Sequence, residues 1–295
     1  MPVGVAADMA WLSLLPSGLV LEEMALLAGT TFVAAGVNAV AGGGTILTFP
    51  VVAAILPDGP ARLVAANATS TIGLWPGALT AAWATRAERD GQPRWTRWLL
   101  PASVGGAIVG AILVLALPPA WFGRLVPWLI LGAAMLFALQ PRLSARLGAA
   151  RRDPHTIDGE PTRGMFLLAW GLQFLVAVYG GYFGAGIGIL MLAVLGCLGL
   201  GDFHRINAVK NVLGTAINGT TAVMFIAASI LPVGLLAAPA GAGVVSWPHA
   251  IVMALASVAG GFVGVRLTRR LPAALVRRIV ALIGFALAGY YFLRG

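Results

Sequence analysis

Two clusters of glycine lie within apolar sequence and have the composition of an anion-binding site. Residues 42–44 precede a short apolar run at 45–57, and the glycines of 184–188 precede the apolar residues 189–195 of another short run, 186–200. A glycine break frees backbone N–H groups at the start of the next helical arm, where the helix dipole is positive. Two such helix N-termini pointing to the middle of a membrane would hold an anion without a fixed positive charge.

Glycine has a second use in membranes, because small residues also let two helices pack closely without binding anything. For the two clusters we favour binding, because both occur at short, interrupted segments. For the separate pairs Gly106 and Gly110, and Gly260 and Gly264, we favour close helix packing.

Lys210 is the only lysine in the chain and lies in the apolar run 206–230. A lysine at the bilayer centre costs about 2.5–3.5 kcal/mol on insertion scales, so its presence suggests a functional site. The alternative is snorkelling: Lys210 lies only about 8 Å deeper than Arg205 along a helix, and its stem is long enough to reach water. Both interpretations stay open at this stage.

Several neutral side chains could donate hydrogen bonds to an oxyanion near these features. Asn211 adjoins Lys210, Asn67, Thr69 and Ser70 lie near the equivalent place in the first half of the chain, and Asn38 and Tyr179 each precede a glycine cluster by about one helical turn. Asn211, Asn67, Thr69 or Ser70 taken singly is more often a contact between helices than a ligand. The other polar residues of the apolar segments are Gln173, Asn218 and Tyr182, and Tyr182 equally suits the interfacial aromatic belt. The predicted substrate-binding set is Asn38, Gly42, Gly43, Gly44, Thr45, Asn67, Thr69, Ser70, Tyr179, Gly184, Gly186, Gly188, Lys210 and Asn211.

The residues that are missing from the apolar segments narrow the chemistry further. All ten carboxylates lie in loops or at segment ends, which argues against cation transport. No histidine pair has metal-ligand spacing, and the lysine is not part of a phosphate-binding loop motif. Nor does a nucleophile–base pair appear, so the sequence predicts no catalytic residue, no metal, no cofactor and no enzyme activity.

The composition assigns the class of protein. Of 295 residues, 59% are hydrophobic and 10% are charged, and the mean hydropathy is +0.92. A soluble domain carries about 25% charged residues, so this much apolar surface requires lipid as the solvent. The net charge of +9 comes from arginines spread between apolar segments, as the orientation of a membrane protein requires, and we expect no nucleic-acid partner.

The apolar segments divide the chain into two halves of five. We expect an extramembrane lead-in at 1–22, a first transmembrane repeat at 23–140, a cytoplasmic linker at 141–164 and a second repeat at 165–295. Spanning takes roughly 20 helical residues, so the runs 45–57 and 186–200 are too short to cross alone and look like second arms of broken helices. The segments are 24–41, 45–57, 63–83, 98–117 and 121–139, then 165–183, 186–200, 206–231, 247–265 and 275–293.

The two halves resemble each other, and the arginines indicate that they are inverted. Residues 117–126 match 271–280, and the paired glycines named above match at the same offset. The loops 84–97 and 266–278 and the linker are rich in arginine, whereas 232–246, the repeat counterpart of 84–97, holds none. By the positive-inside rule, corresponding loops lie on opposite sides of the membrane. The predicted fold is an all-α polytopic membrane protein of two inverted repeats, multi-pass in a bacterial inner membrane.

The sequence of 35–50, AGVNAVAGGGTILTFP, resembles the first signature of the TauE/SafE sulfite exporter family, also called the toluene sulfonate uptake permeases. The segment 179–188, YGGYFGAGIG, resembles its second signature, and the similarity covers about 24–293. The resemblance implies export or uptake of sulfite, thiosulfate, sulfoacetate or related organosulfonates, with binding near the glycine breaks. The chain departs from the family pattern at Thr45 and Ala185.

The leading hypothesis is therefore a secondary transporter of sulfite or an organosulfonate, working by alternating access between the two repeats. The alternatives are transport of another small organic anion and a non-transporting membrane scaffold. The expected partners are a small anionic substrate, the lipid bilayer and, in a homo-oligomer, further copies of the chain.

Overall fold

The described part of the chain is built from α-helices. The computed structural model describes residues 17–40, 42–89, 93–149, 163–197, 203–230, 244–268 and 273–294. In the first half the helices are α2 (Ser17–Val40), α3 (Thr45–Ile55), α4 (Arg62–Ala84), α5 (Pro93–Ala116) and α6 (Pro119–Ala149), with a short 3₁₀ helix, η2 (Arg86–Arg89). In the second half they are α7 (Arg163–Tyr182), α8 (Ile187–Cys197), α9 (Phe203–Ile230), α10 (Trp247–Thr268) and α11 (Ala273–Arg294).

These helices confirm the all-α polytopic architecture expected from the sequence. Four of them contain stretches that are long and apolar enough to cross a membrane by themselves: Trp95–Ala116, Pro119–Leu136, Arg205–Ile230 and Trp247–Arg266. Helix α2 begins within the predicted lead-in, and α6 continues into the predicted linker as far as Ala149. Helix α7 begins at Arg163, inside the predicted linker. Residues 1–16 and 150–162 lie outside the described residues, so the domain boundaries stay predictions.

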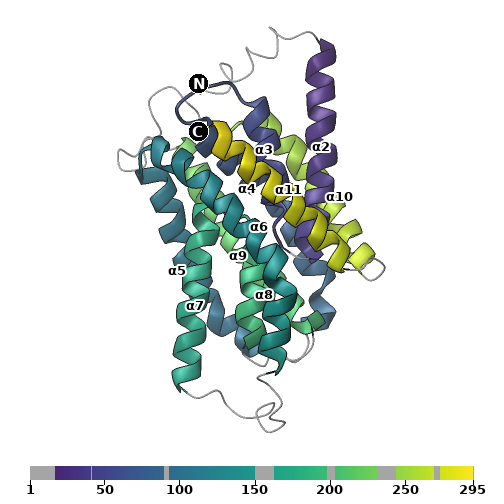
Figure 1. Cartoon of the computed structure of the whole chain (residues 1–295), viewed down its shortest axis with the longest axis vertical. Coiled ribbons are helices and arrows are strands. Elements are labelled where there is room, and N and C mark those ends of the chain that lie inside the picture. The colour runs from purple at the N-terminus through teal and green to yellow at the C-terminus, as the bar shows by residue number, and fades with distance from the viewer. Residues whose placement is uncertain are drawn as a thin grey trace.

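Two helices are interrupted at the glycine clusters. Helix α2 ends at Val40 and α3 begins at Thr45; in the same way α7 ends at Tyr182 and α8 begins at Ile187. Helices α3 and α8 have 11 residues each, too few to span the hydrocarbon region, which needs roughly 20. They extend to opposite ends of the molecule, α3 in the upper half and α8 in the lower half of Figure 1.

The separate glycine pairs are packing residues, as the sequence predicted. A Cβ atom added at Gly110 would lie 2.2 Å from the backbone oxygen of Val178, which shows how closely α5 approaches α7. A Cβ added at Gly260 would lie 2.2 Å from the backbone oxygen of Phe32, so α10 approaches α2 equally closely. Gly106 and Gly264 belong to the same two interfaces. Each half of the chain thus packs a glycine-bearing helix on the first helix of the other half.

This exchange produces two three-helix groups that mix the halves. Helices α2, α4 and α10 form one group, and α5, α7 and α9 form the other; α4 and α9 pack together between them, and α6 pairs with α11. Helices in corresponding positions of the two halves therefore make corresponding contacts. The inverted relation of the halves stays a prediction, and these contacts agree with it.

The close approach of α5 and α7 yields a test of the packing. Replacing Gly110 with alanine places a methyl group against the backbone of α7, and overpacking of this kind typically costs about 1–3 kcal/mol. We expect Gly110→Ala to lower the unfolding free energy by that amount, measured by denaturant titration in detergent. Gly171→Ala is the matched control, because nothing lies within 4 Å of an added Cβ there. Equal stabilities of the two variants would contradict the packing role.

Candidate functional site

Both glycine breaks use backbone conformations that other residues avoid. Gly42 and Gly43 have φ of 71° and 130°, and Gly184 and Gly186 both have φ of 79°. No other glycine in the described residues has a positive φ, and no non-glycine residue there has one. Because a Cβ atom clashes with the backbone in this region, glycine is required to turn the chain between the two arms of each broken helix.

The two breaks lie against each other. A Cβ added at Gly42 would stand 2.3 Å from the Cα of Gly188, so the backbones touch at that point. A Cβ added at Gly184 would be 3.8 Å from Thr45 Oγ1 and 4.0 Å from Asn218 Oδ1. The start of α3 and the start of α8 therefore meet in one place, as the anion hypothesis requires.

Each break uses a side chain of its own incoming helix to satisfy its backbone. In the first break, the N–H of Gly42 donates to the carbonyl of Asn38 at 3.0 Å, and the N–H of Gly43 donates to Asn38 Oδ1 at 3.0 Å. In the second, the hydroxyl of Tyr179 donates to the carbonyl of Ala185 at 2.7 Å. Asn38 and Tyr179 thus hold the shape of the breaks in this conformation.

Each break is also contacted by a long helix of the opposite half. Asn67 of α4 donates to the carbonyl of Tyr182, the last residue of α7, at 3.1 Å. Asn207 of α9 donates to the carbonyl of Ala39, near the end of α2, at 3.4 Å. The two asparagines satisfy carbonyls that a helix terminus leaves without an intrahelical partner. They link each long helix to the interruption in the other half.

Lys210 lies at the C-terminal end of α2. Its Nζ donates to the carbonyls of Asn38 and Ala39 at 3.3 and 3.5 Å, and the side chain is 2% exposed. The ammonium therefore does not snorkel to the surface. It lies instead at the negative end of the α2 dipole, which favours a cation. Within the described residues, Lys210 makes no ion pair with a carboxylate, since the pair found there joins Arg62 and Asp58.

The polar face of α9 lines a small cavity beside Lys210. Asn211, Thr215 and Asn218 follow one another on this face, and Asn38, Gly42 and Gly188 complete the wall near the breaks. Asn211 donates to Thr85 Oγ1 at 3.3 Å, and the Thr215 hydroxyl lies 2.7 Å from the Asn211 carbonyl and 3.0 Å from the Ala78 carbonyl. The volume of the cavity is about 20 Å³, and a single water needs roughly 10–15 Å³ on this measure.

The structure separates the predicted site residues into two groups. The first group lines the cavity or adjoins it. The residues in the cavity wall are Asn38, Gly42, Gly188, Lys210 and Asn211. Gly184 lies close to both Thr45 and Asn218 at the junction of the breaks. Gly43 and Gly186 carry the positive φ angles, Gly44 packs against the carbonyl of Ala34, and Tyr179 braces the second break.

The second group, Asn67, Thr69 and Ser70, lies outside the cavity wall. Asn67 bonds to the end of α7, and Thr69 accepts a hydrogen bond from the backbone of Ser246 at 3.0 Å. Ser70 is fully buried, and its hydroxyl has no partner among the described residues. None of the three is part of the cavity wall.

Sequence reasoning did not select two cavity residues, Thr215 and Asn218. They follow Asn211 at helical spacing, so the i, i+4, i+7 pattern of polar residues in an apolar helix was the available signal. No group of three or more His, Cys, Asp or Glu side chains suited to a metal ion occurs within the described ranges.

Comparison with known protein families assigns the chain to a family independently of the geometry described above. The family model described as "Sulfite exporter TauE/SafE" matches residues 27–291. This chain belongs to the TauE/SafE sulfite exporter family. The family assignment makes it a multi-pass membrane transporter, and the resemblance inferred from the two glycine motifs is confirmed.

Two curated relatives carry the same general description. A "Probable membrane transporter protein" of Haemophilus influenzae is 26% identical over 269 residues, covering 90% of this chain and 92% of that protein. A "Probable membrane transporter protein ORF9" of Sinorhizobium sp is 25% identical over 270 residues, covering 90% of each. No solved structure matches the chain at a significant level.

The contact between the breaks can be tested by one methyl group. Gly42→Ala forces an L-residue into positive φ, at about 1–2 kcal/mol, and adds a clash with Gly188 of about 1–3 kcal/mol. We expect the unfolding free energy to fall by at least about 2 kcal/mol in a denaturant titration. Gly59→Ala in the α3–α4 connection should be nearly neutral, because nothing lies within 4 Å of its Cβ. A Gly42→Ala protein as stable as the Gly59→Ala control would refute the contact.

Proposed function

We propose that this TauE/SafE protein is a secondary transporter of a small sulfur-containing anion, sulfite or an organosulfonate, which binds where the two broken helices meet. The observation that carries the proposal is Lys210, a buried cation with no carboxylate partner in the described residues, beside a cavity whose wall includes Asn211, Asn218 and the first turn of α8. Intramembrane cations are costly and usually mark a substrate or ion pathway.

The groups around the cavity suit a small oxyanion better than a cation or a neutral solute. Lys210 supplies a positive charge, the amides of Asn211 and Asn218 supply neutral donors, and the first turn of α8 supplies a positive dipole end. No carboxylate lies in the cavity wall. The sulfur chemistry of the substrate comes from the family description alone, and another small organic anion is the alternative.

The cavity must enlarge for transport, since a space of about 20 Å³ has room for about one water molecule. We infer that the present conformation is closed around an empty site. Because each three-helix group combines helices from both halves, the movable bodies are these groups and not the sequence repeats themselves. The groups meet along α4 and α9, so a change in the angle between these two helices would open the cavity to either side in turn. This mechanism refines the alternating access expected for inverted repeats.

Transport and the role of Lys210 can be tested in proteoliposomes. We expect radiolabelled sulfite to enter liposomes that contain the wild-type protein, and Lys210→Met to weaken sulfite binding by at least about tenfold, because a hydrogen bond to a charged group contributes about 1.5–3 kcal/mol. Arg97→Gln, an exposed cation on α5, is the control and should transport normally. If no oxyanion tested enters the liposomes, transport is contradicted and the non-transporting scaffold is the remaining hypothesis.

Asn218 gives a cleaner test than Lys210, because its removal breaks no hydrogen bond found in the described residues. Asn218→Ala should leave the stability of the empty protein unchanged and reduce sulfite-dependent thermal stabilisation, with affinity falling about two- to tenfold. The readout is the melting temperature with and without sulfite. An unchanged sulfite response would remove Asn218 from the site.

Asn67 should behave in the opposite way. It bonds to the end of α7 and does not line the cavity, so Asn67→Ala should lower stability by about 1–3 kcal/mol through the orphaned carbonyl of Tyr182. Sulfite affinity measured on the folded fraction should stay within about twofold of wild type, below the effect of one lost neutral hydrogen bond. A tenfold loss of affinity would instead return Asn67 to the binding set.

A further inference from the structure

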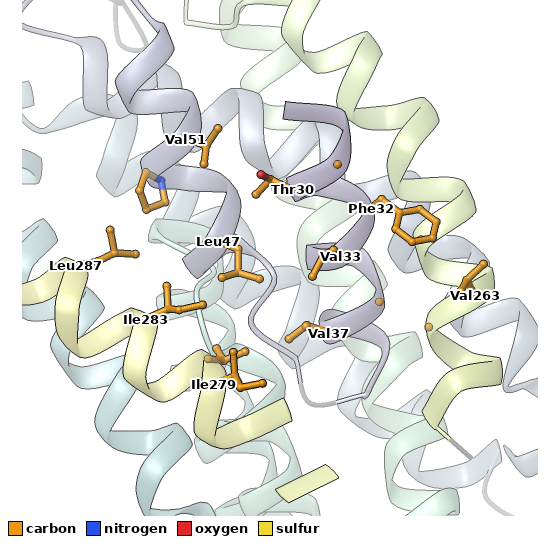
Figure 2. A pocket seen from close by; sticks show the side chains of 16 residues that line it. Thr30, Phe32, Val33, Val37, Leu47, Val51, Val263, Ile279, Ile283 and Leu287 are labelled. Atoms are coloured by element: carbon orange, nitrogen blue, oxygen red, sulfur yellow. The ribbon is translucent and has the colours of Figure 1, made fainter. Parts of the chain in front are cut away.

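A groove of about 700 Å³ separates α11 from α2 on the lipid-facing side of the molecule. Figure 2 shows Ile279, Ile283 and Leu287 of α11 along one wall, Val33 and Val37 of α2 along the other, and α3 behind them. The walls are almost wholly apolar. In the hydrocarbon region a groove of this kind is filled by lipid chains, because no water is available there.

A second, polar cavity of about 1,100 Å³ continues from this groove. Pro50 and Leu287 line both spaces, so the two are adjacent. Its wall contains Arg62 at the start of α4 and Arg124 in α6. The aromatic side chains of Trp128, Tyr290, Tyr291 and Phe292 also line it, as is typical of the interface between hydrocarbon and headgroups.

The two arginines stand at the end of the molecule where arginine is scarce. Asn211, near the start of α9, bonds to Thr85 at the end of α4, so Arg86 and Arg205 lie at the same end. The positive-inside rule assigns that end to the cytoplasm. Arg62, at the other end of α4, is therefore extracytoplasmic, and Arg124 lines the same cavity. The positive-inside rule favours few cations on that side of the membrane, so it does not explain the presence of Arg62 and Arg124 there.

We propose that the two cavities together bind one phospholipid with an anionic headgroup from the outer leaflet. The phosphate would lie between Arg62 and Arg124 among the aromatic side chains, and an acyl chain would follow the apolar groove between α2 and α11. Arg62 forms an ion pair with Asp58, whose side chain is 91% exposed. Arg124 makes no ion pair within the described residues. Arg124 is therefore the main charge for the headgroup. Charge at one end and apolar walls at the other match the two ends of such a lipid.

The site holds the lipid beside α11, which belongs to neither three-helix group. Helix α11 pairs with α6 and touches α3 only lightly, whereas α6 contacts α8 more extensively. The lipid chain thus occupies the space left where α11 stands away from α2 and α3. This inference does not depend on which anion is transported, and binding is measured without flux.

Native mass spectrometry of the full chain, released from nanodiscs of equal phosphatidylglycerol and phosphatidylcholine, tests the proposal. We expect wild-type protein to retain phosphatidylglycerol over phosphatidylcholine by at least about fivefold, and Arg124→Gln to lose about that factor. Ile283→Trp, which fills the groove, should reduce retention of both lipids. The controls are Arg266→Gln, exposed at the end of α10, and Leu282→Trp, 69% exposed on the neighbouring face of α11; both should match wild type.

Three outcomes would overturn the proposal. The first is equal retention of the two lipids by wild-type protein. The second is displacement of phosphatidylglycerol by millimolar sulfite, which would make the arginine cavity a substrate vestibule. The third is a lipid-free dimer that dissociates on Ile283→Trp, which would assign the groove to a second copy of the chain. Folding of each variant is checked by its melting temperature, and a second groove variant, Val33→Trp, replaces Ile283→Trp if that protein unfolds.

Discussion

A helix interrupted inside a membrane must find partners for the backbone groups that the interruption releases, because no water is present to hydrate them. This chain interrupts two helices at nearly the same place. Asn38 and Tyr179 satisfy part of each break from its own incoming helix. Asn67 and Asn207 reach across from the opposite half to the remaining carbonyls. The positions of α4 and α9 follow from this requirement, since each must pass close to the break it serves.

The same requirement explains where the small residues lie. The backbones of the two breaks meet, and the contact of Gly42 with Gly188 leaves no space for a methyl group. The outer helices must then close around them, and α5 packs on α7 and α10 on α2 through further glycines. Each half of the chain is consequently interlocked with the other. Moving one half alone would separate both glycine interfaces, and the proposed motion between the two three-helix groups keeps both intact.

Much of this fold could be predicted from sequence, and the reasons are physical. The order and approximate positions of the helices follow from apolar length, although α2 begins before its predicted segment and α6 continues past its own to Ala149. The break positions follow from glycine, whose positive φ other residues avoid. The rotation of each helix about its axis could not be predicted. Gln173 and Asn218 look alike in the sequence, yet Gln173 donates to Ser103 at 2.9 Å whereas Asn218 lines the cavity. Thr69 resembled a ligand, but its oxygen accepts the backbone N–H of Ser246, in a segment distant along the chain.

The placement of Lys210 also bears on how an empty transporter could close. A buried ammonium without a counter-ion would oppose closure, because desolvating a charge costs several kcal/mol. Here the carbonyls of Asn38 and Ala39 and the negative end of α2 partly compensate the charge when no anion is present. An arriving anion would therefore compete for the ammonium with the end of the first broken helix. Under the proposed function, binding would loosen the contact between α9 and α2 while neutralising the site. Occupancy of the cavity would then be coupled to the angle between the groups that enclose it.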